Sequence, residues 1–154
     1  MRVVGLDVGA RRIGVAVSDP TCTLARPVGV VRPAALEGDA PRLVAAEIGR
    51  LAAEEDGVSS IVVGLPRHLD GSASAMTARV TVFAKEVGRL TRLPVTLQDE
   101  RLTSREAESR LAITDKDWRT RKERLDAAAA AIILQDYLDV RPGRPIPIAA
   151  DPDM

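Results

Sequence analysis

The first residue whose type could do chemistry is Asp7. It lies within residues 3–8, whose other members are valine, leucine and glycine. Burying an unpaired carboxylate in such a segment costs on the order of several kcal/mol, so a plain core position does not explain it. Asp7 is either the end of a strand, hydrogen-bonded to the following turn, or part of a site that binds a cation.

Two adjacent acids, Asp99 and Glu100, form the second candidate. They directly follow residues 94–98, a short apolar segment typical of a strand. Functional groups gather at the carboxyl ends of parallel strands. Because successive side chains alternate between faces, only one of the two acids can point at a given site. The sequence leaves open which one it is, and a solvated turn would also account for the pair.

The third candidate is Asp126, which precedes five alanines and the segment 132–134 of isoleucine and leucine. On a helix it shares a face with Ala130, Ile133 and Tyr137, so the carboxylate falls on the face expected to be buried. The small alanines would let that helix approach a sheet closely. The alternative is an acid in the first turn that complements the helix dipole, worth about 0.3–1 kcal/mol.

Together these acids predict a binding site for a divalent cation, because a cation would neutralise carboxylates set on apolar faces. Oxygen donors in a chain with one histidine favour Mg²⁺ or Mn²⁺ over zinc. Two such ions, about 4 Å apart, would bind the attacking water and the leaving oxygen of a phosphodiester. A Ser-His-Asp or Cys-His nucleophile set is not readily assembled from one histidine and one cysteine.

The elements that must position these acids follow from apolar periodicity. Residues 2–18 read as two strands joined by a turn in which Gly9 could supply a positive φ, and residues 25–31 read as a third strand. Short links between them predict an antiparallel meander. Apolar runs at residues 59–66 and 94–98 are typical of buried parallel strands.

Helical periodicity separates and follows the later strands. Asp39 can cap a helix that reaches about residue 55, and a stripe from Met76 to Leu90 predicts a second helix. Residues 103–112 read as a third helix, a charged segment follows over 113–124, and the last helix extends from about residue 123 to 139. The chain is therefore predicted to be α/β, with three antiparallel strands continued by parallel strands in a mixed five-stranded sheet flanked by helices.

The composition of the chain limits the classes of partner that it is expected to bind. The chain has 154 residues with 22 basic and 22 acidic side chains, which argues against a uniformly basic nucleic-acid coat. Aromatic residues make up 2%, too few for platforms that stack bases. One cysteine and the lack of a membrane-length apolar run predict a cytoplasmic protein that does not enter a membrane. We expect residues 1–140 to form one domain and the Pro-rich residues 141–154 to be a disordered tail.

The motifs of the chain, in their order and spacing, resemble those of the YqgF/RuvX family over about residues 2–139. The matching blocks are Gly5-Leu6-Asp7-Val8-Gly9 with Arg12-Ile13-Gly14-Val15-Ala16 and Ser18-Asp19, then Val63-Gly64-Leu65-Pro66 with Asp70-Gly71-Ser72, then Asp99-Glu100-Arg101-Leu102-Thr103-Ser104 with Glu106-Ala107, and finally Asp126 with Ala129-Ala130 and Ile133-Leu134-Gln135.

This resemblance implies an RNase H-like fold. Members of the family are described as pre-16S rRNA nucleases and, by likeness to RuvC, as Holliday-junction resolvases. The resemblance implies that Asp7, Glu100 and Asp126 are catalytic and bind the metal, with Asp99 as the alternative to Glu100. It places Arg12 and Arg101 near the phosphate.

The chain departs from the family at two places. It has Arg67-His68 where the family often has Leu-Asn, and Arg124-Leu125 where a Lys-Val pair is common. The second change keeps the charge. The first leaves the role of the loop open, although Arg67 could reach a phosphate, and His68 could serve as a ligand or base or could simply be exposed.

Basic residues are concentrated just before the last helix. Residues 116–124 carry a local excess of three positive charges, which indicates either a solvated linker or a mobile arm that binds a nucleic-acid backbone. The candidate contacts are Lys116, Arg119, Arg121, Lys122 and Arg124. Trp118 within this segment could stack on a base or pack on the domain, and Cys22 is expected to be a passive small side chain.

The function expected from these observations is a metal-dependent endonuclease that hydrolyses structured RNA, in 5′-end maturation of pre-16S rRNA. The first alternative is a Holliday-junction resolvase acting on branched DNA with the same chemistry. The second is a non-catalytic rRNA-binding factor in ribosome assembly. The sequence is compatible with a monomer or a homodimer, since symmetric interfaces leave no recognisable pattern here.

Overall fold

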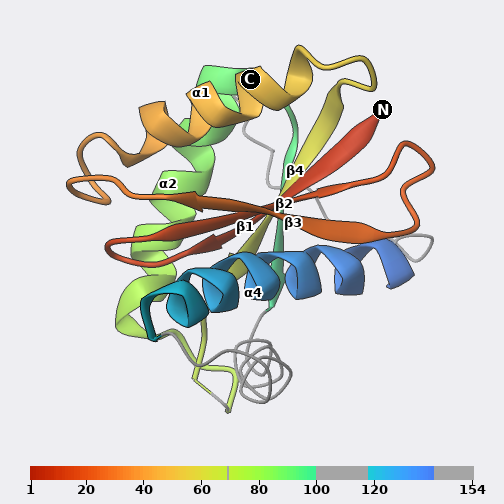
Figure 1. The fold of residues 1–154 in the computed structure, drawn as a ribbon. Coiled ribbons are helices and arrows are strands. Elements are labelled where there is room, and N and C mark those ends of the chain that lie inside the picture. Colours follow the sequence, from red (N-terminus) through yellow and green to blue (C-terminus); the bar gives the residue numbers. More distant parts are fainter. Residues whose placement is uncertain (69, 100–117, 141–154) are drawn as a thin grey trace.

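The computed structural model describes residues 1–68, 70–99 and 118–140, with side chains in the last range from residue 125 onward. Three consecutive strands come first and helices separate the later strands; the labels follow Figure 1. In chain order they are β1 (Arg2–Val8), β2 (Ile13–Ser18), β3 (Ala25–Val31), α1 (Ala40–Ala52), β4 (Val58–Leu65), α2 (Ala75–Thr91), β5 (Val95–Asp99) and α4 (Trp118–Val140).

The strands form one mixed sheet in the order β3-β2-β1-β4-β5. The short links between β1, β2 and β3 allow only antiparallel neighbours, whereas β4 and β5 are reached through helices and lie parallel to β1. The sheet predicted from the sequence is confirmed. Its consequence for function is that β1, β4 and β5 end at the same edge.

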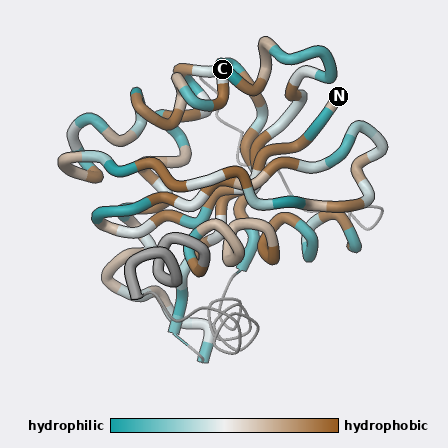
Figure 2. The backbone as a smooth tube through the Cα atoms, in the orientation of Figure 1, coloured by the Kyte–Doolittle hydropathy of each residue, from teal (hydrophilic) through white to brown (hydrophobic). Residues whose placement is uncertain are grey.

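Helices cover both faces of this sheet: α1 and α2 lie on one face and α4 on the other (Figure 1). Side chains alternate along β1, so that Val4 and Leu6 pack in the larger core with α1 and α2, and Val3 packs in the smaller core under α4. Figure 2 shows the hydrophobic residues concentrated along the central strands. By this alternation, Asp7 falls on the α4 face.

Two glycines let α4 lie close to the sheet. A Cβ on Gly5 of β1 would lie 2.7 Å from the Cβ of Leu134 and 3.1 Å from the carbonyl oxygen of Ala130. A Cβ on Gly14 of β2 would lie well inside van der Waals contact with the carbonyl group of Asp126. Helix and strands therefore meet backbone to backbone at these points.

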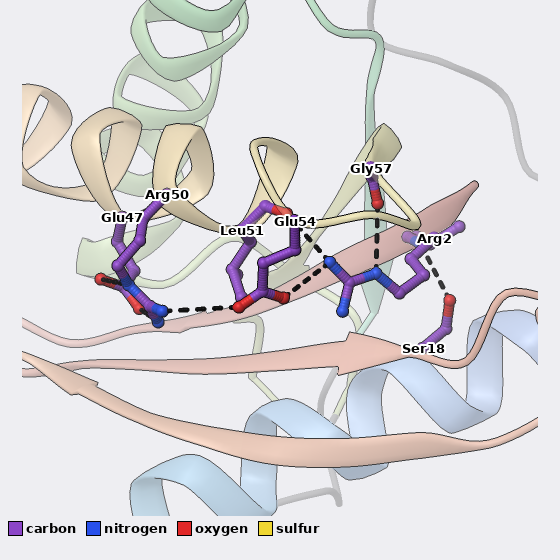
Figure 3. A network of polar contacts seen from close by, with 8 residues as sticks. Arg2, Ser18, Glu47, Arg50, Leu51, Glu54 and Gly57 are labelled. Carbon is purple, nitrogen blue, oxygen red and sulfur yellow. Dashed lines mark hydrogen bonds and ion pairs between the residues drawn. The ribbon is translucent and has the colours of Figure 1, made fainter.

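Arg2 ties the start of β1 to the end of α1 (Figure 3). Its guanidinium is buried and donates to the carbonyl oxygens of Leu51 (2.9 Å) and Gly57 (3.2 Å) and to Glu54 Oε1 (2.9 Å). The carbonyl of Leu51 lies at the end of α1 and also accepts a hydrogen bond from the N–H of Glu54 (3.1 Å). The Glu54 carboxylate balances the buried charge of Arg2. Arg2 is thus a structural residue, at the edge of the sheet opposite to the carboxyl ends of β1 and β4.

The helix that carries Asp126 begins earlier than the sequence predicts. We expected a linker over residues 113–124, whereas α4 begins at Trp118 and continues to Val140. Residues 118–124 contain neither proline nor glycine and are mostly long charged side chains that favour helix, so nothing in them ends the helix. The backbone of residues 118–124 is therefore helical and not a free arm.

Two local details differ from those that the sequence suggested. Asp39 precedes α1, but its carboxylate accepts hydrogen bonds from the backbone N–H groups of Ala34 (2.9 Å) and Ala35 (3.0 Å), so it holds the preceding turn and does not cap the helix. Gly9 does not adopt a positive φ. A Cβ there would instead lie 3.0 Å from the carbonyl oxygen of Arg12.

Within residues 1–68, 70–99 and 118–140, no helix has the length and hydropathy needed to cross a membrane. The expected helix over residues 103–112 and the expected tail over residues 141–154 lie outside the described residues.

Candidate functional site

Asp7 stands near the carboxyl end of the central strand, half-buried among apolar neighbours. Its register partner on β2 is Gly14. Since Gly14 has no side chain, the space beside Asp7 on the α4 face is filled by the helix itself. The carboxylate therefore points toward the helix that crosses β2 at this position.

Asp126 is the residue of α4 that lies over Gly14. The contacts of Gly5 with Ala130 and Leu134, and of Gly14 with Asp126, show that α4 runs antiparallel to β1. One helical turn separates Ala130 from Asp126, about 6 Å, and two strand residues separate Gly5 from Asp7, about 7 Å. The two carboxylates predicted from the sequence are thus brought to one place on one face, from residues 119 positions apart.

Strand alternation separates Asp99 from this pair. On β5, Val95 and Leu97 pack in the larger core with α1 and α2. Asp99 follows at the same parity and pairs with Leu65 of β4, which also lies in that core. Asp99 therefore falls on the face opposite to Asp7.

Glu100 lies outside the described residues. Among the residues that the structure describes, no group of three or more His, Cys, Asp or Glu side chains is arranged to bind a metal ion. The described part of the site is thus Asp7 and Asp126, with the neighbouring side chains of the β1–β2 turn.

Arg12 provides a positive charge at this site. Its Nε lies 2.7 Å from Asp126 Oδ2, and the two side chains are 28% and 25% exposed. The backbone of Arg12 is held by the turn, because its carbonyl oxygen accepts a hydrogen bond from the N–H of Gly9 (2.9 Å). The structure thus places Arg12 beside an acid of the site, where the resemblance implied only the vicinity of the phosphate.

Arg67 and His68 are exposed on a hairpin that follows β4 at the same edge of the sheet. The hairpin is well bonded internally. The hydroxyl and the N–H of Ser72 donate to Asp70, at 2.7 and 2.8 Å, and hold the pKa of that carboxyl below its ordinary value. The guanidinium of Arg67 donates to the carbonyl oxygen of Gly71 at 3.4 Å. Arg67 and His68 are thus both exposed to solvent at this edge of the sheet.

The remaining candidates for nucleic-acid contact lie at the start of α4 or outside the described residues. Arg119, Arg121, Lys122 and Arg124 belong to the first turns of α4, and of their side chains nothing is described. Arg101 and Lys116 lie outside the described residues. Cys22 is partly buried, with its Sγ 3.4 Å from the carbonyl oxygen of Met1.

Sequence reasoning missed the residues that dock α4. Gly14 could have been noticed as an isolated glycine inside an apolar strand, a sign of close backbone approach. Gln135 gave no such signal: its Oε1 accepts from the N–H of Ala25 and its Nε2 donates to the carbonyl oxygen of Thr23, each at 2.9 Å. Both residues orient the helix that carries Asp126.

Comparison with known proteins identifies the family of the chain. The family model described as "RuvX: Holliday junction resolvase" matches residues 1–140. A relative from Anaeromyxobacter sp. (strain Fw109-5), named "Putative pre-16S rRNA nuclease", is 44% identical over 141 residues, which is 92% of this chain and 98% of the relative. A relative of the same name from Chloroflexus aggregans is 42% identical over 139 residues, 90% of this chain and 94% of the relative.

Solved structures show the same fold at low sequence identity. Thermus thermophilus RuvC in complex with a Holliday junction substrate matches with a TM-score of 0.56 and 17% identity, over 96% of this chain and 99% of that protein. The fowlpox virus Holliday junction resolvase matches with a TM-score of 0.52 and 14% identity, over 90% of this chain and 98% of that one. The RNase H-like fold expected from the sequence is confirmed.

Proposed function

The chain belongs to the RuvX family, and from this premise we propose that it is a metal-dependent endonuclease that hydrolyses phosphodiester bonds of structured RNA. The observation that carries the proposal is the convergence of Asp7 and Asp126 on the α4 face, over Gly14 at the carboxyl edge of the sheet. Two carboxylates on a half-buried face are costly unless a cation compensates them. A divalent cation is the compensation that phosphodiester hydrolysis also needs.

The donor set suits a hard cation. Carboxylate oxygens are the ligands of Mg²⁺ and Mn²⁺, and the guanidinium beside Asp126 shows that a positive charge is accommodated there. We propose that Asp7, Asp126 and Glu100 hold the ion. Glu100 is preferred to Asp99 because Asp99 falls on the opposite face. When bound, the ion would activate a water and stabilise the charge that develops on the phosphate.

The chain's own residues would hold the substrate around that centre. Arg12 lies within the site, and Arg67 is exposed on the hairpin at the same edge, so both suit contacts to phosphate oxygens. We assign Arg101, Lys116, Arg119, Arg121, Lys122 and Arg124 the same role on the strength of the sequence. Because the chain has no net charge, it would bind the phosphate backbone of a nucleic acid through local basic residues such as these.

The favoured substrate is the precursor of 16S rRNA at its 5′ end, by analogy with the curated relatives. That reaction would place the protein in the cytoplasm and needs one active site, so a monomer suffices. The second candidate is resolution of a Holliday junction, favoured by the family description and by the fold neighbours. Paired nicks on a symmetric junction need two active sites and therefore a homodimer.

A cleavage assay tests the proposal on both substrates, a precursor 16S rRNA fragment and a four-way DNA junction. The unaltered protein should cut the RNA with Mg²⁺ or Mn²⁺ and not in EDTA, and Asp7→Asn should abolish cleavage while leaving folding and metal-free RNA binding largely intact. Asp56→Asn, an exposed acid between α1 and β4, is the control.

Each alternative has its own outcome. Cutting of the junction by paired nicks, with the RNA untouched, would select the resolvase. Tight RNA binding without cleavage, insensitive to Mg²⁺ and equal in Asp7→Asn, would select a non-catalytic assembly factor. Equal cleavage by Asp7→Asn and the unaltered protein in Mn²⁺ would remove Asp7 from the site.

A further inference from the structure

The ion pair between Arg12 and Asp126 involves the same carboxylate that we assign to the metal. The guanidinium Nε is 2.7 Å from Oδ2, and both side chains are about three-quarters buried. The turn also restrains Arg12 through the hydrogen bond from Gly9 to its carbonyl oxygen. The pair is therefore more shielded from water than an ordinary surface ion pair.

A guanidinium and a divalent cation compete for one carboxylate. Both are positive, and in a half-buried site they repel each other over the few ångströms that a shared ligand imposes. Binding of the metal at Asp126 thus favours departure of the Arg12 side chain. An arginine released at the edge of the site presents planar donors that match the oxygens of a phosphate.

We propose that Arg12 is an internal counter-ion of the metal-free site, which the incoming metal displaces and which then binds the nucleic-acid backbone. This inference rests on the proposed function. It makes metal binding and substrate binding mutually reinforcing, because the metal frees Arg12 for phosphate and phosphate draws Arg12 from Asp126. Linkage requires the two effects to be equal in size.

Isothermal titration calorimetry of the full chain with Mn²⁺ alone measures the competition without any turnover. Arg12→Gln removes the charge, so we expect it to bind Mn²⁺ about 2- to 5-fold more tightly than the unaltered protein, the upper part of the range for ion pairs near a protein surface. Arg12→Lys keeps the charge and should stay near the unaltered value. Arg11→Gln, an exposed residue of the same turn, is the matched control and should change nothing.

The same variants report on the coupling. A non-cleavable RNA analogue should tighten Mn²⁺ binding by the unaltered protein and should do so less in Arg12→Gln, which should also bind that analogue more weakly. Thermal unfolding without metal verifies that each variant is folded; should Arg12→Gln unfold, Arg12→Met supplies the uncharged variant at similar length.

Unchanged Mn²⁺ affinity in Arg12→Gln would overturn the counter-ion role. Weaker affinity would overturn it as well, since it would mean that Arg12 orients Asp126 in the loaded site. Both results leave the proposed function standing. If the unaltered protein binds no Mn²⁺, both the proposed metal-dependent nuclease activity and the counter-ion role of Arg12 are wrong.

Discussion

Gly14 of β2 and Asp126 of α4 touch through their backbones, because a Cβ on Gly14 would penetrate the carbonyl group of Asp126 and lie 3.1 Å from the backbone nitrogen of Ala127. Gly14 is also the register partner of Asp7. One missing side chain thus sets the separation of the two carboxylates. The site depends on this contact as much as on the acids themselves.

Substitution Gly14→Ala should force the start of α4 away from the sheet. We expect a loss of about 1–3 kcal/mol in the free energy of unfolding, as for overpacked interiors. Cleavage should fall about 100-fold, because a shift of about 1 Å is enough to misplace a reacting group. Urea denaturation and the RNA cleavage assay measure the two effects.

The control for that variant is Gly29→Ala on β3, where a Cβ meets nothing within 4 Å. It should change stability by less than about 0.5 kcal/mol and leave cleavage intact. Equal effects at the two glycines would show that the contact with Asp126 is unimportant.

The alternation along β5 distinguishes the adjacent acids. Asp99→Asn should retain cleavage within about 3-fold, because Asp99 falls on the face of Val95 and Leu97. Glu100→Gln should lower cleavage at least about 100-fold, as expected when an essential acid is lost. Rates at saturating Mg²⁺ for the two variants decide between them, and the reverse order would assign the ligand to Asp99.

Gln135 fastens the other end of α4 to the sheet by two hydrogen bonds, with Ala25 and Thr23. Gln135→Ala should lower the free energy of unfolding by about 1–2 kcal/mol, since it removes both bonds from a partly buried position. Asp139→Ala removes only the bond at 3.0 Å within the helix and should cost less than about 0.5 kcal/mol. Equal losses in urea denaturation would contradict a clamp between helix and sheet.

Stability should depend on pH through Asp19. The backbone N–H of Leu24, with the Thr21 hydroxyl and the N–H of Thr23, holds the pKa of Asp19 well below its ordinary value of 3.8. A lowered pKa stabilises the folded state above the ordinary value, and this contribution is lost as pH falls below it.

The corresponding variant is Asp19→Ala. It should be less stable than the unaltered protein at pH 7, and the difference should narrow as the pH falls below about 4. Asp56→Ala, at an exposed acid between α1 and β4, is the control. Denaturation midpoints between pH 7 and pH 2.5 measure both, and a constant difference for Asp19→Ala would contradict its role as an acceptor in the turn.

Much of the architecture follows from local sequence. The alternating and continuous apolar runs predict every strand to within about two residues, because burial on a sheet imposes its period directly on the chain. Asp7 and Asp126 are recognisable for a related reason. Burying a carboxylate on an apolar face costs free energy, whichever element that face packs against. The start of α4 was missed because charged residues that favour a helix also favour a solvated linker.

What the sequence by itself determined is which residues are in the sheet, which helices cover it and which acids need an explanation. The tertiary structure alone decided that Asp7 and Asp126 share one face of the sheet and that Asp99 falls on the other. It also decided that Arg12 forms an ion pair with Asp126. The reason is that these relations depend on strand order, on the parity of each residue and on how closely α4 approaches Gly5 and Gly14. Side chains far apart in the sequence form one site only when the packing of helix backbone against strand backbone fixes the distance between them.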